Sequence, residues 1–194
     1  MDVSETRVTL LTRLRDESDP AAWAEFYQRY QELIALFAGR WGLQQADCDD
    51  VIQETLAKLV RSMPSFEYDR TKGRFRAYLK TVVSSVVLTK LRQKAKRPDV
   101  QHLDHVPEPS SENIDLMWES EWRRHHVRLA MRRIRNEYNS TDCLAFDRYA
   151  LNGEDPKAVA ESLSMSIDRV YQAKSRIMQR MRSLIDAQIS EEEL

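Results

Sequence analysis

The sequence predicts an all-α protein of two small helical domains joined by a flexible acidic linker. Only four glycines occur among 194 residues, which leaves little room for the hairpins of a β fold. Long segments carry apolar residues at the three- and four-residue steps of an amphipathic helix. Prolines, serines and acids gather in residues 98–113, which therefore divide the chain into domains at 1–97 and 114–194.

Three helices are predicted in the first domain. Ser18-Asp19-Pro20 reads as an N-cap followed by proline in the first turn, and this helix runs to about Trp41, before Gly42. Its apolar positions form an aromatic-rich buried stripe: Trp23, Phe26, Tyr27, Tyr30, Leu33, Ile34 and Phe37. A second helix starts near Asp47 and stops at Pro64; its apolar positions are Val51, Ile52, Thr55, Leu56, Leu59, Val60 and Met63. A third helix runs from about Arg74 to Arg97.

Four helices are predicted in the second domain, at about 114–138, 142–152, 156–163 and 167–187. Ser164-Met165-Ser166 forms a tight connection between the last two, and Ser166 can cap the final helix. A short helix, a turn and a basic second helix make a helix-turn-helix, which places the second helix in the major groove of DNA. Six residues of this segment are candidates for base and phosphate contacts: Ser166, Asp168, Arg169, Gln172, Lys174 and Arg176.

The net charge of −1 results from cancellation between blocks of opposite sign. Residues 70–97 hold ten basic and no acidic side chains, and residues 169–182 hold five basic and none acidic. Residues 1–69 carry a net −6, and residues 99–121 a net −7. Such segregation predicts two surfaces that face polyanions, separated by an acidic connector.

Composition excludes several other classes. No apolar run approaches the ~20 residues of a membrane span, and arginines interrupt the N-terminal apolar stretch, so a cytoplasmic protein without a secretory signal is expected. Cys48 and Cys143 lack the spacing of a zinc site, and His102 and His105 fall within the acidic linker. No glycine-rich phosphate loop, nucleophile elbow or paired-histidine metal motif occurs. Neither an enzyme, a metal site nor a cofactor is therefore predicted.

The first domain contains two short sequence motifs, one after the other, that together are more specific than either alone. The segment Asp50-Val51-Ile52-Gln53-Glu54 has the form D-x-x-Q-E, and Gly73-Arg-Phe-Arg-Ala-Tyr-Leu79 follows about twenty residues later. With the helix-turn-helix beyond them, these segments resemble sigma factors of bacterial RNA polymerase, of the compact extracytoplasmic-function type. The resemblance extends from about Ala21 to Leu184.

The resemblance implies roles for both domains. The first would bind the polymerase's largest subunit through a polar face comprising Asp49, Asp50, Gln53 and Glu54. It would also bind and melt the minus-ten promoter element through Arg74, Arg76, Tyr78, Lys80, Ser85, Thr89 and Arg92. Phe66, Tyr68, Phe75 and Tyr78 are candidates for stacking on unpaired bases, with core packing as the alternative for the last two. The second domain would read the minus-thirty-five element, and an anti-sigma protein is a further implied partner.

Ser85 and Thr89 depart from the asparagine and aspartate that the family commonly carries there, so the base preference and the melting activity are open. Two other functions remain as alternatives. One is an operator-binding regulator whose N-terminal bundle acts as a sensor, although the two separate basic blocks argue against it. The other is a sigma-like protein that binds polymerase without opening promoters.

Overall fold

The computed structural model describes residues 10–16, 19–65, 75–95 and 109–192, and all regular structure in these ranges is helical. The predicted all-α fold is therefore confirmed. The chain divides into two compact units, and their boundary lies between Arg123 and Arg124. Residues up to Arg123 are called unit 1 below, and Arg124–Ser190 are called unit 2.

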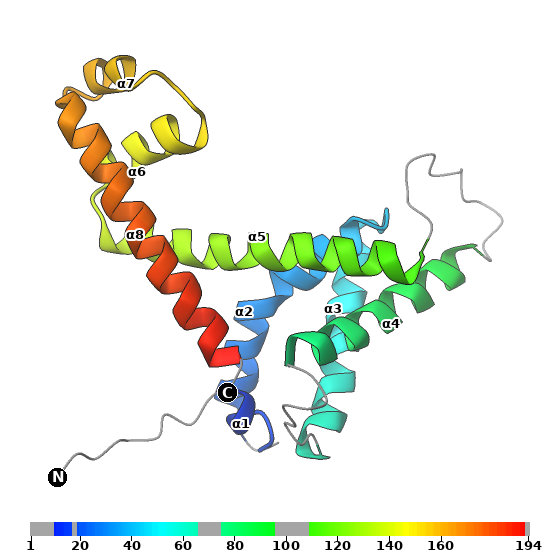
Figure 1. The fold of residues 1–194 in the computed structure, drawn as a ribbon. Helices are drawn as coiled ribbons and strands as arrows, with labels where there is room; N and C mark the ends of the chain where they lie inside the picture. Colours follow the sequence, from blue (N-terminus) through cyan, green and yellow to red (C-terminus); the bar gives the residue numbers. More distant parts are fainter. Residues whose placement is uncertain (1–9, 17–18, 66–74, 96–108, 193–194) are drawn as a thin grey trace, which may run out of the picture. The chain divides into compact units, whose positions relative to one another are not determined.

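Unit 1 begins with the short helix α1 (Leu10–Arg13) and three long helices, α2 (Pro20–Gly39), α3 (Gln45–Ser62) and α4 (Phe75–Ala95). The Asp19 side chain accepts a hydrogen bond from the backbone N–H of Ala22 at 2.8 Å, as expected of the N-cap. Helix α3 packs against both α2 and α4 (Figure 1). A 3₁₀ turn over Met63–Ser65 follows α3 and contains Pro64, which lacks the N–H that would continue the α-helix.

An aromatic core fills unit 1. Phe26, Tyr30 and Phe37 of α2 are buried as the helical period predicted, whereas Trp23 and Tyr27 are half-buried at the edge of the core. Val60 differs from the expectation, since 38% of it is exposed. Phe75 is fully buried against Phe26 and Tyr30, so it packs in the core and presents no free ring face for a base.

Helix α5 (Ser111–Glu137) changes the domain division expected from the sequence. Trp118 and Trp122, near its N-terminal end, are buried in the core of unit 1. The Trp118 ring meets Phe37 edge-on at 5.2 Å, and the Trp122 ring stacks on Tyr30 at 6.3 Å. Because Ser111 already begins the helix, the described chain starts α5 inside the predicted linker 98–113, and the unit boundary falls ten residues beyond residue 113.

Unit 2 contains the remainder of α5, then α6 (Ser140–Phe146), α7 (Pro156–Ser162) and, as far as Ser190, α8 (Ile167–Glu192). The single helix expected over 142–152 is α6 followed by a π-helical turn, Asp147–Leu151. Gly153 then adopts a φ of 72°, a left-handed conformation that ends this segment. Two apolar clusters hold α8 in place, one against α5 and α6, including Ile134, Phe146 and Ile177, and one against α7, including Val159 and Val170.

Candidate nucleic-acid interface

Helices α7 and α8 are joined by a short connection whose geometry follows from its side chains. Asp155 caps α7 by accepting hydrogen bonds from the N–H groups of Lys157 and Ala158 at 2.9 and 3.1 Å. Ser164 takes the left-handed conformation, with a φ of 51°, and reverses the chain after α7. The Ser166 hydroxyl then accepts from the N–H of Arg169 at 3.2 Å, so Ser166 caps α8 as predicted.

The two sides of α8 differ in polarity. The predicted apolar seam is buried and also includes Ala173: Val170, Ala173, Ile177, Met181 and Leu184. The candidate contact residues Asp168, Arg169, Gln172 and Arg176 are exposed, whereas Lys174 is half-buried. The Lys174 ammonium lies 4.7 Å from the centre of the Tyr149 ring, where the π electrons attract a cation.

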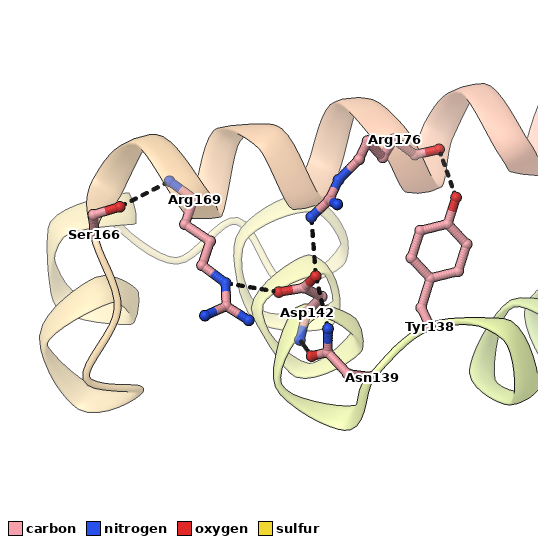
Figure 2. Close-up of polar contacts among 6 residues, drawn as sticks. All are labelled: Tyr138, Asn139, Asp142, Ser166, Arg169 and Arg176. Atoms are coloured by element: carbon pink, nitrogen blue, oxygen red, sulfur yellow. Dashed lines mark hydrogen bonds and ion pairs between the residues drawn. The ribbon is translucent and has the colours of Figure 1, made fainter.

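Two of the exposed arginines are bound by one carboxylate. Asp142, in the first turn of α6, accepts from Arg169 Nε at 3.2 Å and from Arg176 Nη2 at 3.0 Å, as Figure 2 shows. Its Oδ2 atom also accepts from Asn139 Nδ2 at 2.9 Å. The Asp142 side chain is only 4% exposed, against 49% for Arg169 and 55% for Arg176. A buried carboxylate is stable only with such partners, because burial otherwise disfavours its charge.

A second carboxylate binds the next arginine along α8. Glu137 accepts from Arg180 through both of its oxygens, at 2.7 and 2.8 Å, and pairs with Arg133 one turn back on its own helix. The hydrogen bonds from Arg180, supplemented by Arg133, lower the pKa of Glu137 to about 2. Acidic side chains of α5 and α6 therefore fix three arginines of α8.

In unit 1, the residues predicted to bind the minus-ten element lie on different flanks of α4. Arg76 and Lys80 face α5: Arg76 pairs with Glu119 and lies 5.2 Å from the Trp122 ring centre, while Lys80 Nζ lies 2.7 Å from Asp115. Tyr78 and Ser85 face α3, where they hydrogen-bond to Ser62 and Lys58. Thr89 donates to the carbonyl of Ser85, and Arg92 is exposed. Arg74, Phe66 and Tyr68 lie outside the described residues.

The polar face of α3 is exposed as expected. Asp49, Asp50, Gln53 and Glu54 all reach solvent, on the side opposite the buried Val51, Thr55 and Leu59. Lys90 of α4 contacts this face, with its ammonium 2.9 Å from both Asp50 and Glu54. Hydrogen bonds to these two carboxylates, that to Asp50 first, raise the pKa of Lys90.

Comparison with known families identifies the segment that carries these two faces. Residues 26–97 match the family model of sigma-70 region 2. This segment of the chain is therefore similar to region 2 of sigma-70 proteins. Region 2 thus takes in α3 and α4 with most of α2, all inside unit 1, and it contains both segments on which the resemblance to sigma factors was based.

Two further comparisons add little to this assignment. Among solved structures, that of CnrH in complex with the cytosolic domain of CnrY aligns at 17% identity over 92% of this chain and 96% of the other, with a TM-score of 0.35. No curated protein matches the chain.

Several contacts of the protein were not predicted from its sequence. Asp142 and Lys90 bind residues that are distant in sequence, and nothing in the local pattern marks either pairing. Trp118 and Trp122 did offer a signal, since their spacing of four residues marks one helix face, but not the unit that buries them. Within the described ranges, no three His, Cys, Asp or Glu side chains could jointly hold a metal ion, and no helix is long and apolar enough to cross a membrane. His102 and His105 fall outside those ranges.

Proposed function

We propose that the chain is a sigma factor of the extracytoplasmic-function type, which brings core RNA polymerase to promoters and opens them. The match of residues 26–97 to sigma-70 region 2 carries this proposal. Nucleotide addition would belong to the polymerase, so the chain needs no catalytic residue or cofactor of its own. A cytoplasmic location and control by an anti-sigma protein are part of the proposal.

Polymerase binding is assigned to α3. Asp49, Asp50, Gln53 and Glu54 present carboxylates and an amide to solvent on one side of a helix whose other side is in the core. Lys90 lies against Asp50 and Glu54, and such a surface ion pair contributes only ~0–1 kcal/mol. A basic partner surface can therefore replace Lys90 at little cost.

Minus-ten binding is assigned to α4. Arg76 and Lys80 would leave Glu119 and Asp115 for DNA phosphates, an exchange between surface ion pairs of similar strength. Arg92 is exposed and requires no such exchange. The hydroxyls of Ser85 and Thr89 donate to backbone carbonyls of their own helix, so base contacts through them would use their remaining lone pairs.

Minus-thirty-five binding is assigned to α7 and α8 as a helix-turn-helix. The exposed side of the N-terminal half of α8 offers Asp168, Arg169, Gln172 and Arg176, an assortment of donors and acceptors suited to base edges in the major groove. Ser166 lies at the N-terminal end of α8, where backbone N–H groups can meet a phosphate. Lys174 would contribute a phosphate contact from the flank.

Run-off transcription with bacterial core polymerase on genomic fragments tests the proposal. A sigma factor binds core polymerase without DNA and produces discrete start sites, whereas an operator-binding regulator does neither. A template with a pre-opened bubble separates the third possibility: transcription from the bubble alone would identify a protein that recruits polymerase but cannot melt DNA. Absence of any complex with core polymerase would contradict the proposal.

A further inference from the structure

Asp142 connects two residues of α8 that are far apart along that helix. Arg169 and Arg176 are seven residues apart, which corresponds to about 10 Å along the helix axis. Their guanidinium groups nevertheless bind the two oxygens of one carboxylate, and in Figure 2 Arg169 reaches Asp142 from the left and Arg176 from above. The carboxylate offsets the repulsion between the two cations and restricts both side chains to one arrangement.

The contacts with Asp142 leave most of each guanidinium available. Arginine has five N–H donors; Arg169 uses Nε and Arg176 uses Nη2 in this contact. Each guanidinium therefore has two nitrogens that do not bind Asp142, and about half of each arginine side chain is exposed. A guanine offers two acceptors, O6 and N7, at the major-groove edge, and a pair of donor nitrogens from one arginine matches them.

The Asp142 side chain is itself held in a fixed position. The Asp142 carboxylate is almost fully buried, and besides the two arginines it binds the side-chain amide of Asn139. The side-chain oxygen of Asn139 accepts the backbone N–H of Asp142 at 2.8 Å, so the residue is fixed from both ends. Any rearrangement of the arginines away from Asp142 would leave a buried charge without its cations.

We propose that Asp142 is a positioning residue for sequence reading, which holds Arg169 and Arg176 so that both guanidinium groups address guanines at neighbouring base pairs of the minus-thirty-five duplex. The inference rests on the proposed function, because it assumes that α8 enters the major groove there. It adds a residue from outside the helix-turn-helix, on α6, that touches no base. The negative charge of Asp142 also lowers attraction to phosphates in general, so the same contact favours specific over non-specific binding.

The test uses the full chain bound to core polymerase and a duplex library randomised over the minus-thirty-five element. Binding to selected and unselected duplexes is measured for wild type, Asp142→Asn and Glu137→Gln. Glu137→Gln is the matched control, because it also removes one carboxylate that binds an arginine of α8 but leaves Arg169 and Arg176 untouched. Circular dichroism and thermal melting report whether each variant folds.

The expected result is that Asp142→Asn lowers the preference for guanine about tenfold, as loss of one bidentate contact would, while binding to unselected duplex is unchanged or tighter. Glu137→Gln should keep the preference. Retention of the guanine preference by Asp142→Asn would overturn the inference. An equal loss of affinity for selected and unselected duplexes would overturn it too, since that result identifies a role in folding alone.

A second variant decides the matter if Asp142→Asn does not fold. The double substitution Arg169→Lys with Arg176→Lys keeps both positive charges but removes the two-pronged donors, so the guanine preference should fall while the salt dependence stays the same. Unchanged preference in the double variant would refute base reading by these arginines. If wild type selects no duplex and yields no transcript with core polymerase, the proposed function itself fails; selection by wild type with an unaltered Asp142→Asn preference defeats only this inference.

Discussion

Glu137 makes the stability of the molecule depend on pH. Because Arg180 stabilises the ionised carboxyl, the pKa of Glu137 is about 2 in the folded chain against an ordinary 4.5. A carboxyl whose pKa is lowered by folding adds stability above its ordinary pKa and loses that contribution as the pH falls through the folded value.

We therefore expect wild type to melt at a higher temperature than Glu137→Gln at neutral pH. The difference should be constant above a pH of about 4.5 and should shrink as the pH is lowered toward 2. Thermal melting of both proteins in parallel across this range measures it. A difference that does not change with pH would show that the variant acts through packing and not through the charge on Glu137.

On α3, Gln53 and Glu54 are expected to contribute to polymerase binding and little to folding. Gln53→Ala combined with Glu54→Lys removes an amide and reverses a charge on an exposed face, so affinity for core polymerase should fall at least tenfold, or about 1.4 kcal/mol, while helicity stays unchanged. Titration of labelled chain with core polymerase measures the affinity.

Glu25→Lys is the matched control for this double variant. Glu25 lies on α2, is 52% exposed and pairs with Arg13, so the change reverses a similar ion-paired charge elsewhere in unit 1. It should leave polymerase affinity unchanged. Equal losses in both variants would point to a general effect of charge, and normal affinity in the double variant would remove α3 from the binding surface.

At the scale of the element, α5 is expected to stabilise unit 1 through its indoles. Trp118 is 1% exposed, and Trp118→Ala should cost about 3–5 kcal/mol of unfolding free energy, because the cavity left among aromatic rings cannot collapse. Leu116 lies on the same helix but is 63% exposed, so Leu116→Ala should stay within about 0.5 kcal/mol of wild type. Urea denaturation of the two variants makes the comparison, and similar costs would contradict the burial of Trp118.

The helices themselves were largely predictable because their signals are local. Asp19 and Ser166 cap helices through bonds to residues three positions away, and the buried stripe of α2 follows the helical period. Pro64 ends the second helix as predicted, whereas the π-helical turn at Asp147–Leu151 is not encoded in the apolar period. Periodicity also shows which face of a helix is buried but not what covers it, which is why α5 was assigned wholly to the second domain.

In the candidate interface, too, the exposed helix face was predictable from the sequence, but the contacts between distant residues were not. Spacing alone placed Arg169 and Arg176 on one side of α8, and that side is exposed. Their bonds to Asp142 span 27 and 34 residues, and only the packing of α6 against α8 brings these side chains together. On α4 the prediction from spacing was less accurate. Arg76 and Tyr78 were predicted to share one DNA-binding surface, but Arg76 faces α5 and Tyr78 faces α3.

For the molecule as a whole, the charge blocks meet within unit 1. Arg76 and Lys80 of the basic block 70–97 pair with Glu119 and Asp115 of the acidic block 99–121, and Arg40, the C-cap of α2, pairs with Glu121 of the same acidic block. Glu121 is buried and directly precedes Trp122 in the chain. Its ion pair with Arg40 therefore acts on the same stretch of α5 as the contacts of the indole rings. The N-terminal part of α5 is therefore held on unit 1 by complementary charge as well as by the two tryptophans.

This arrangement predicts where the first domain ends. A fragment of residues 1–123 retains both indoles and the three acids, whereas a fragment of residues 1–110 exposes the aromatic core that they cover. At roughly 4–8 °C per kcal/mol for a domain of this size, the shorter fragment should melt at least about 10 °C lower or fail to fold. Trp118→Ala with Trp122→Ala in the longer fragment should lower its midpoint toward that of the shorter one. Equal midpoints for the two unsubstituted fragments would place the boundary ahead of α5, where the sequence pattern alone had put it.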